Sequence, residues 1–117
     1  MKYVSIKNPI KLSELKDMSK KMEDCLVKAV IDVELNVMTV DASMHVDEEQ
    51  YMLEERESMQ KNLWGINLYP FEFNTNKWIE FDSMINIRPW QQNRSRGVEC
   101  VATQSKIRDI VNKLVQE

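Results

Sequence analysis

A β-hairpin is predicted by two stretches of the sequence, Leu63-Trp-Gly-Ile-Asn-Leu68 and Ile79-Glu-Phe-Asp-Ser-Met-Ile-Asn-Ile-Arg88. Apolar and polar residues alternate in both stretches, as they do in strands that bury one face. Between them, Pro70 and the polar run 74–77 supply the residue types that form turns. We therefore expect an antiparallel hairpin over residues 62–88.

The register of this hairpin follows from its alternation. If Leu68 pairs with Ile79, the apolar side chains of both strands share one face and the polar side chains share the other. A shift of one residue would bury Glu80 and Asp82, so the parity of the pairing is fixed. Gly65 then lies among the polar side chains and leaves a gap that a backbone or a ligand can enter.

The residues before this hairpin predict a helix and then another hairpin, over residues 27–42. Apolar residues recur every three or four positions from Lys11 to Leu26, which is typical of an amphipathic helix. The period then changes to two over residues 27–33 and 38–42. We expect two strands here, with Val33 facing Met38 across a tight turn.

Two further helices are expected. Asp47 and Gln50 resemble a capping pair at the start of a short helix over 48–56. The acidic residues between Asp47 and Glu57 are interpreted as the solvated face of that helix. A last helix is predicted from Thr103, because a regular apolar stripe follows it.

These elements predict one α+β domain over residues 1–117. We expect a four-stranded antiparallel sheet made of two hairpins, with the N- and C-terminal helices packed on its apolar face. Pro89 ends the last strand, and residues 90–101 show no period, so this segment is predicted to be a surface loop.

Composition narrows the classes of function. The chain has 117 residues, of which 43% are hydrophobic and 30% charged, as in an ordinary globular domain. Its net charge of −3 makes nucleic acid an unlikely partner. No apolar run approaches the roughly 20 residues that span a bilayer, and no signal segment precedes the first helix. A cytoplasmic protein without a membrane segment is expected.

The cysteines and glycines indicate neither a metal site nor a cofactor. Cys25 and Cys100 are the only cysteines and lie far apart, so we expect two buried thiols rather than metal ligands. Gly65 and Gly97 are the only glycines, which excludes the glycine-rich loops that cradle nucleotide phosphates.

The polar face of the 62–88 hairpin is the first candidate site. It carries Asn67, Glu80, Asp82, Asn86 and Arg88. The period of the preceding strand adds His45, the only histidine, which a carboxylate of Glu80 or Asp82 could orient as a general base. Arg88 would then hold an anionic group of the substrate. The alternative is that these residues form a solvated sheet face or tie down the following loop.

The 89–96 loop is the second candidate, because Trp90, Arg94 and Arg96 could clamp a small anionic ligand or an acidic partner. Internal salt bridges are the alternative use of these arginines. We therefore expect a binding or interaction module that uses the polar face and this loop. A small hydrolase with His45 as base is the enzyme alternative. A structural homodimer, anchored by exposed Trp78, Met84 and Trp90, is a third class.

The same stretches resemble a family of small prokaryotic proteins, the domain of unknown function numbered 5674. The resemblance is carried by Leu63-Trp-Gly-Ile-Asn-Leu-Tyr-Pro70, by Ile79 to Pro89 and by Asn93-Arg-Ser95, and it covers most of the chain. Family members carry a Gly-Ser pair where this chain has Arg56-Glu57-Ser58, and an acidic residue near the position of Cys100. The family brings no activity.

The resemblance also implies which residues belong to the family pattern, and Asn93 thereby joins Arg94 among the candidate ligand-binding residues. The implied set is His45, Gln60, Trp64, Asn67, Glu80, Asp82, Asn86, Arg88, Asn93 and Arg94.

Overall fold

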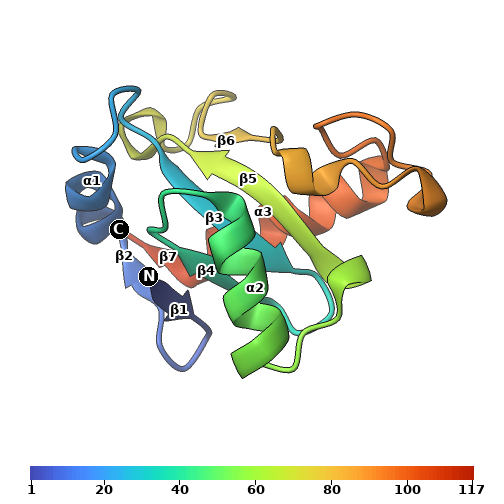
Figure 1. The fold of residues 1–117 in the computed structure, drawn as a ribbon. Helices are drawn as coiled ribbons and strands as arrows, with labels where there is room; N and C mark the ends of the chain where they lie inside the picture. The colour runs from blue at the N-terminus through green and yellow to red at the C-terminus, as the bar shows by residue number, and fades with distance from the viewer.

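A five-stranded antiparallel sheet forms the centre of the computed structural model, which describes residues 1–117 (Figure 1). The strand order is β1-β4-β3-β5-β6. The strands are β1 (Lys2–Val4), β3 (Val27–Asp32), β4 (Val37–Val40), β5 (Leu63–Leu68) and β6 (Ile79–Glu80). The α+β class is as predicted, but the sheet has five strands rather than four, because the N-terminal residues add β1 beside β4.

Three helices pack on this sheet, α1 (Leu12–Ser19), α2 (His45–Glu55) and α3 (Val101–Leu114). Short 3-10 turns occur at η1 (Gln60–Asn62), η2 (Pro70–Glu72), η3 (Met84–Asn86) and η4 (Pro89–Gln91). A separate parallel pair, β2 (Ile10–Lys11) with β7 (Val115–Gln116), joins the two ends of the chain. The first helix ends seven residues earlier than predicted, and α2 begins three residues earlier.

Helices cover both faces of the sheet. In Figure 1, α2 lies in front of the strands and α3 behind them. The larger apolar cluster joins the strands to α1 and α3, and includes Leu15, Ile66 and Ile110. The smaller cluster, Val30, Val37, Met52 and Leu63, lies under α2. The prediction that one sheet face stays polar and open to solvent is therefore wrong over the residues that α2 covers.

The hairpin of β3 and β4 has the predicted parity but a different register. Ile31, rather than Val33, pairs with Met38, which is a shift of two residues. The carboxylate of Asp32 accepts the N–H groups of the second and third residues after it, at 2.9 Å each. Asn36 closes the turn in the left-handed region, with φ of 58°. Asp32 thus starts the turn before Val33 can pair with Met38, and the N–H of Val33 donates to the carbonyl oxygen of Asn62 instead.

The hairpin of β5 and β6 keeps its predicted register for only two pairs. Leu68 pairs with Ile79 and Asn67 with Glu80, as expected. The strand then ends, so the prediction that it continues to residue 87 is wrong: residues 84–86 form η3 instead. A Cβ atom placed on Gly65 would lie 2.6 Å from the Cβ of Ser83, so Ser83 occupies the gap expected there.

The surface of α2 and the cysteines also differ from expectation. Glu48 and Glu49, predicted to be on a solvated helix face, are buried. Both cysteines are free and exposed rather than buried. No helix is long and apolar enough to cross a membrane.

Substituting the two glycines should separate a packing constraint from an ordinary loop position. Gly65→Ala places a methyl group against Ser83 and should lower the free energy of unfolding by about 1–3 kcal/mol. Gly97→Ala meets its nearest atoms at 3.5 and 3.6 Å without a positive φ, so it should be neutral or raise stability by up to about 1 kcal/mol. Urea denaturation of both variants measures this. Equal effects would contradict the close packing of Ser83 on Gly65.

Candidate functional site

The structure separates the predicted site residues into three groups. Four of them, His45, Asn67, Asp82 and Arg96, line one surface cavity. Three others, Asn86, Arg88 and Asn93, are buried, and they donate to the backbone carbonyl oxygens of Gly65, Leu63 and Asn86 respectively. Glu80 and Arg94 are exposed outside the cavity lining.

The buried carboxamides hold the 84–96 segment against β5. The Oδ1 of Asn86 accepts the N–H of Gly65 at 2.8 Å, and its Nδ2 donates to the carbonyl oxygen of Gly65 at 2.9 Å. This is the bonding that a neighbouring strand would supply. Asn93 donates to the carbonyl oxygens of Asn86 and Gly97, at 2.8 Å each. Its Oδ1 accepts the N–H of Glu99 at 2.8 Å.

The side chain of Arg88 is buried and makes all its contacts within the protein. It is 1% exposed, and its guanidinium lies 4.2 Å from the ring centroid of Trp64, a cation–π contact. One Nη donates to the carbonyl oxygen of Leu63 at 2.9 Å, and the other donates to that of Gln60. The guanidinium predicted to hold a substrate anion therefore faces backbone carbonyls, and Arg88 is absent from the cavity lining.

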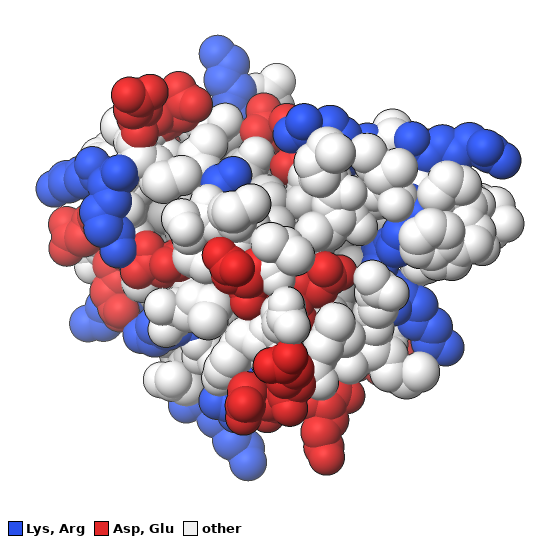
Figure 2. All heavy atoms as spheres, viewed as in Figure 1, with Lys and Arg blue, Asp and Glu red and all other residues white.

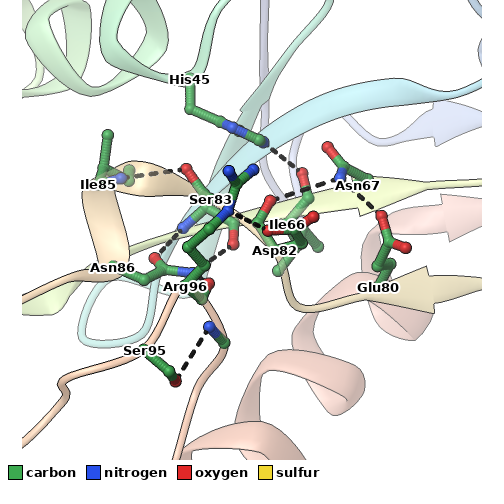
Figure 3. A network of polar contacts seen from close by, with 12 residues as sticks. His45, Ile66, Asn67, Glu80, Asp82, Ser83, Ile85, Asn86, Ser95 and Arg96 are labelled. Atoms are coloured by element: carbon green, nitrogen blue, oxygen red, sulfur yellow. Dashed lines mark hydrogen bonds and ion pairs between the residues drawn. The ribbon is translucent and has the colours of Figure 1, made fainter.

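The cavity has a volume of about 170 Å³ and lies between the start of α2, the sheet and residues 82–85. Figure 3 shows four side chains that approach one another. They are His45 from α2, Asn67 from β5, Asp82 after β6 and Arg96 after η4. The lining residues are Lys28, Met44, His45, Val46, Asn67, Asp82, Ser83, Met84, Ile85 and Arg96. The lining thus combines polar groups with the apolar side chains of Met44, Val46, Met84 and Ile85.

Asn67 lines the cavity, but its amide oxygen is buried and unused. It is 7% exposed, and its Nδ2 donates to Glu80 Oε1 at 2.8 Å and to the carbonyl oxygen of Asp82 at 3.4 Å. Its Oδ1 is buried and receives no hydrogen bond. A buried carboxamide oxygen in this condition normally has a partner, because leaving it without one costs about 1–3 kcal/mol.

Arg96 is oriented by a carboxylate at its side. Its Nε lies 2.6 Å from Asp82 Oδ1, and its backbone carbonyl accepts the N–H of Ser83 at 2.9 Å and the Nδ2 of Asn86 at 2.9 Å. The internal salt bridge considered for this arginine is therefore present. Because Asp82 engages Nε, the two Nη groups of Arg96 are left for other acceptors.

His45 lies in a helix rather than a strand, because β4 ends at Val40 and Asp41 has a φ of 75°. Its Nε2 lies 2.7 Å from the carbonyl oxygen of Ile66. A carbonyl only accepts, so Nε2 carries the proton and Nδ1 is the basic nitrogen. Burial lowers the pKa of His45, and the hydrogen bond to Ile66 partly offsets this. The group that orients the imidazole is thus a carbonyl and not the expected carboxylate.

Two positive groups at the cavity were not predicted. Lys28 on β3 pairs directly with Asn67 on β5, and it has no ion pair. Met44 precedes α2 without a side-chain cap, and Met44, His45 and Val46 line the cavity, so the positive end of the helix lies beside it. The parity of Lys28 was visible in the sequence, but its proximity to Asn67 depends on the order β3-β5, which alternation does not reveal.

Glu48 is a second buried titratable group on α2, one turn after His45. It is fully buried; Oε2 accepts the N–H of Ala42 at 2.9 Å and Oε1 has no partner. Burial raises the pKa of Glu48 well above its ordinary value, and the hydrogen bond from Ala42 only partly offsets this. Folding therefore shifts the balance of Glu48 towards its protonated form, compared with an exposed glutamate.

The predicted dimer anchors differ in exposure. Trp78 is 4% exposed and its Nε1 donates to Asn112 Oδ1 at 3.2 Å, so the expectation of an exposed Trp78 is wrong. Met84 and Trp90 are exposed, as expected. No group of three or more His, Cys, Asp or Glu side chains is placed to hold a metal ion.

Removing the carboxyl group of Glu48 should reduce the pH dependence of stability. Above its ordinary pKa of 4.5 the unfolded carboxyl loses its proton while the folded one keeps it, so wild-type stability falls as pH rises from there towards the raised pKa. The Glu48→Gln variant lacks this titrating carboxyl group. Its free energy of unfolding relative to wild type should therefore rise with pH, by up to about 1.4 kcal/mol per pH unit. Urea denaturation at pH 5, 6 and 7 measures this, with exposed Glu55→Gln as control. Parallel profiles of the variant and wild type would contradict it.

The comparisons with known proteins leave the site geometry as the only guide to function. The family described as "Protein of unknown function (DUF5674)" matches residues 4–114. No curated protein and no solved structure matches. Because the family match spans nearly the whole chain, as the resemblance of its motifs implied, the protein belongs to the DUF5674 family.

Proposed function

We propose that the protein is a binding module that takes a small anionic ligand in the cavity between α2 and residues 82–85. The observation that carries this proposal is the convergence of His45, Asn67, Asp82 and Arg96 on one cavity, although they come from separate parts of the chain. Sites of this kind combine a concave surface with a few converging polar groups.

The charges around the cavity favour an anion. Lys28 has no ion pair, and Asp82 is bonded to the Nε of Arg96, which leaves both Nη groups without a hydrogen bond. The start of α2 adds the positive end of a helix dipole, which Asp47 in its first turn partly offsets. Asp82 is the one carboxylate in the lining, and Arg96 already pairs with it. The groups left to meet a ligand are therefore positive or neutral.

The surroundings of the cavity limit what can enter. Figure 2 shows this face: acidic groups gather over α2, while basic groups flank the 84–96 segment on the right of the view. Met44 and Met84, both more than half exposed, supply uncharged surface beside the cavity. A ligand with one anionic group and a short apolar part would fit this combination better than a polyanion, which the acidic surface of α2 repels.

Anion binding is tested with inorganic phosphate and acetate, using two arginines of the same loop. Arg96→Ala should weaken binding of either anion by about tenfold or more, because it removes a charge-assisted donor from the cavity. Arg94→Ala is the matched control, since the exposed Arg94 does not line the cavity. Isothermal titration and chemical-shift titration both measure the affinity.

The stability of the same variants shows whether loss of binding is specific. The Arg96 side chain is 55% exposed, so its removal should change the free energy of unfolding by no more than about 1 kcal/mol. A larger loss would indicate a structural arginine. Equal binding by wild type and Arg96→Ala, or failure of wild type to bind either anion, would contradict the proposal.

The hydrolase alternative is favoured by one observation, the unprotonated Nδ1 of His45 beside the same cavity. Because burial lowers the pKa of His45, the imidazole is in its basic form at neutral pH. If the protein hydrolyses p-nitrophenyl acetate above the buffer rate, His45→Gln should abolish that activity, since the amide can bond Ile66 but cannot accept a proton. Wild-type rates equal to buffer would contradict esterase activity towards this ester.

A further inference from the structure

We propose that the ligand is a small phosphorus oxyanion that keeps a hydroxyl group, which donates to Nδ1 of His45 while the charged oxygens meet Lys28 and Arg96. This inference rests on the proposed function and adds the chemical class of the anion. Inorganic phosphate and phosphonates carry both kinds of oxygen at neutral pH. Sulfonates and carboxylates are then fully ionised and have acceptors only.

The Nδ1 atom of His45 is an acceptor that a ligand can reach. The ring proton is on Nε2, because this atom lies 2.7 Å from the carbonyl oxygen of Ile66, which only accepts. Nδ1 makes no hydrogen bond, yet it is not among the side-chain atoms that are buried without a partner. Solvent therefore reaches Nδ1, unlike Oδ1 of Asn67, and His45 lines the cavity.

Asp82 supplies a second free acceptor. Its Oδ1 is bonded to Nε of Arg96 at 2.6 Å, whereas its Oδ2 has no hydrogen bond and is not buried. The cavity thus places free acceptors beside two cationic groups, Lys28 and the Nη groups of Arg96. An anion without a proton would meet the cations but would also turn lone pairs towards the acceptors. An oxyanion with a hydroxyl replaces one such contact with a hydrogen bond.

The charged groups of the cavity lie close enough to His45 to act on its imidazole, and Figure 3 shows Asp82 and Arg96 approaching it. Burial lowers the pKa of His45, and the hydrogen bond to Ile66 partly offsets this. The charges of Lys28 and Arg96 lower this pKa further, while the charge of Asp82 raises it. His45 is therefore neutral at pH 7, and Nδ1 keeps the lone pair that the hydroxyl needs.

Size limits the ligand to a small anion. The cavity of about 170 Å³ corresponds to roughly six water molecules at liquid density. Inorganic phosphate and methylphosphonate, each a phosphorus atom with its four substituents, fit this space, whereas a nucleotide would project into solvent. The methyl group of methylphosphonate can also contact Met44 or Met84, which line the cavity.

Two anions of one shape and charge test the proposal on the wild-type protein. Methylphosphonate and methanesulfonate are both chiefly monoanions at pH 7, and they differ in the central atom and in the hydroxyl proton. Chemical-shift titration that follows the backbone signals of His45 and Val46 measures both affinities. Methylphosphonate should bind about fivefold to tenfold more tightly, which is the usual worth of one hydrogen bond.

Titrations at successively lower pH test the role of His45. Both anions keep one negative charge, while the imidazole gains a proton on Nδ1 as the pH falls through its pKa. The hydroxyl then meets a donor instead of an acceptor, and both anions gain a positive partner. The preference for methylphosphonate should therefore disappear, and binding of methanesulfonate should strengthen. The carbon-bound proton signals of the imidazole report its protonation in the same samples.

Two variants assign the preference to named groups. His45→Leu removes the acceptor, so methylphosphonate and methanesulfonate should bind equally. Lys28→Met removes a charge that both anions meet, so it should weaken both by a similar factor and preserve their ratio. If His45→Leu fails to fold, because the carbonyl oxygen of Ile66 loses its donor, the pH series on the wild-type protein still decides.

Inorganic phosphate separates two sources of the proposed group. It carries the same hydroxyl but lacks the methyl group that Met44 or Met84 can contact. Tighter binding of methylphosphonate would indicate an organic ligand, and binding of phosphate at least as tight would indicate free phosphate. Both results support the inference only if the affinity exceeds that for methanesulfonate.

The outcomes separate this inference from the proposed function. Equal binding of methylphosphonate and methanesulfonate at pH 7, with both weakened in Arg96→Ala, would overturn the inference and support anion binding. A preference that persists after His45 is protonated, or in His45→Leu, would overturn the assignment of the acceptor to Nδ1. If none of these anions binds, the inference and the proposed function both fail.

Discussion

The outer edge of β5 is the constraint on which the rest of this structure depends. β6 pairs with only Asn67 and Leu68, so the edge from Leu63 to Ile66 has no neighbouring strand. Side chains close it instead: Asn86 bonds both backbone groups of Gly65, and Arg88 bonds the carbonyl of Leu63. Without them, buried peptide groups would remain unsatisfied. The segment that carries these side chains is consequently held in one path, and that path brings Asp82 and Arg96 to the cavity.

The alternation in the sequence predicted the parity of both hairpins but not where each strand ends. Residues 79–82 and 85–88 alternate with the same parity, yet pairing ends after Glu80, because Ser83 packs onto Gly65. The reason lies in a contact between two residues far apart in sequence, which periodicity cannot detect. The asparagine at 86 was a usable signal, since asparagine is depleted in strands and here its amide takes the place of a strand.

Only part of the candidate site could be predicted, again because periodicity does not detect contacts between residues far apart in sequence. His45 was assigned to a strand because it continues the parity of Thr39 and Asp41, but Asp41 adopts a positive φ and ends that strand. The histidine nevertheless reaches the predicted residues, because α2 crosses the same sheet face. Lys28 and the start of α2 depend on strand order and helix placement, which are properties of the whole fold. Arg88 and Asn93 have the residue types of a binding site, but their hydrogen bonds go to the protein backbone.

The short parallel pair of β2 with β7 has a consequence for the order in which the protein folds. Ile10 pairs with Val115, so this pair joins segments that almost the whole described chain separates. Such a pair forms slowly, because the long intervening segment must lose its conformational freedom before the contact is gained. The α3 and β7 side chains that complete the larger apolar cluster, among them Leu114 and Val115, therefore dock late. Until they dock, the side of the sheet that they cover stays exposed in the partly folded molecule.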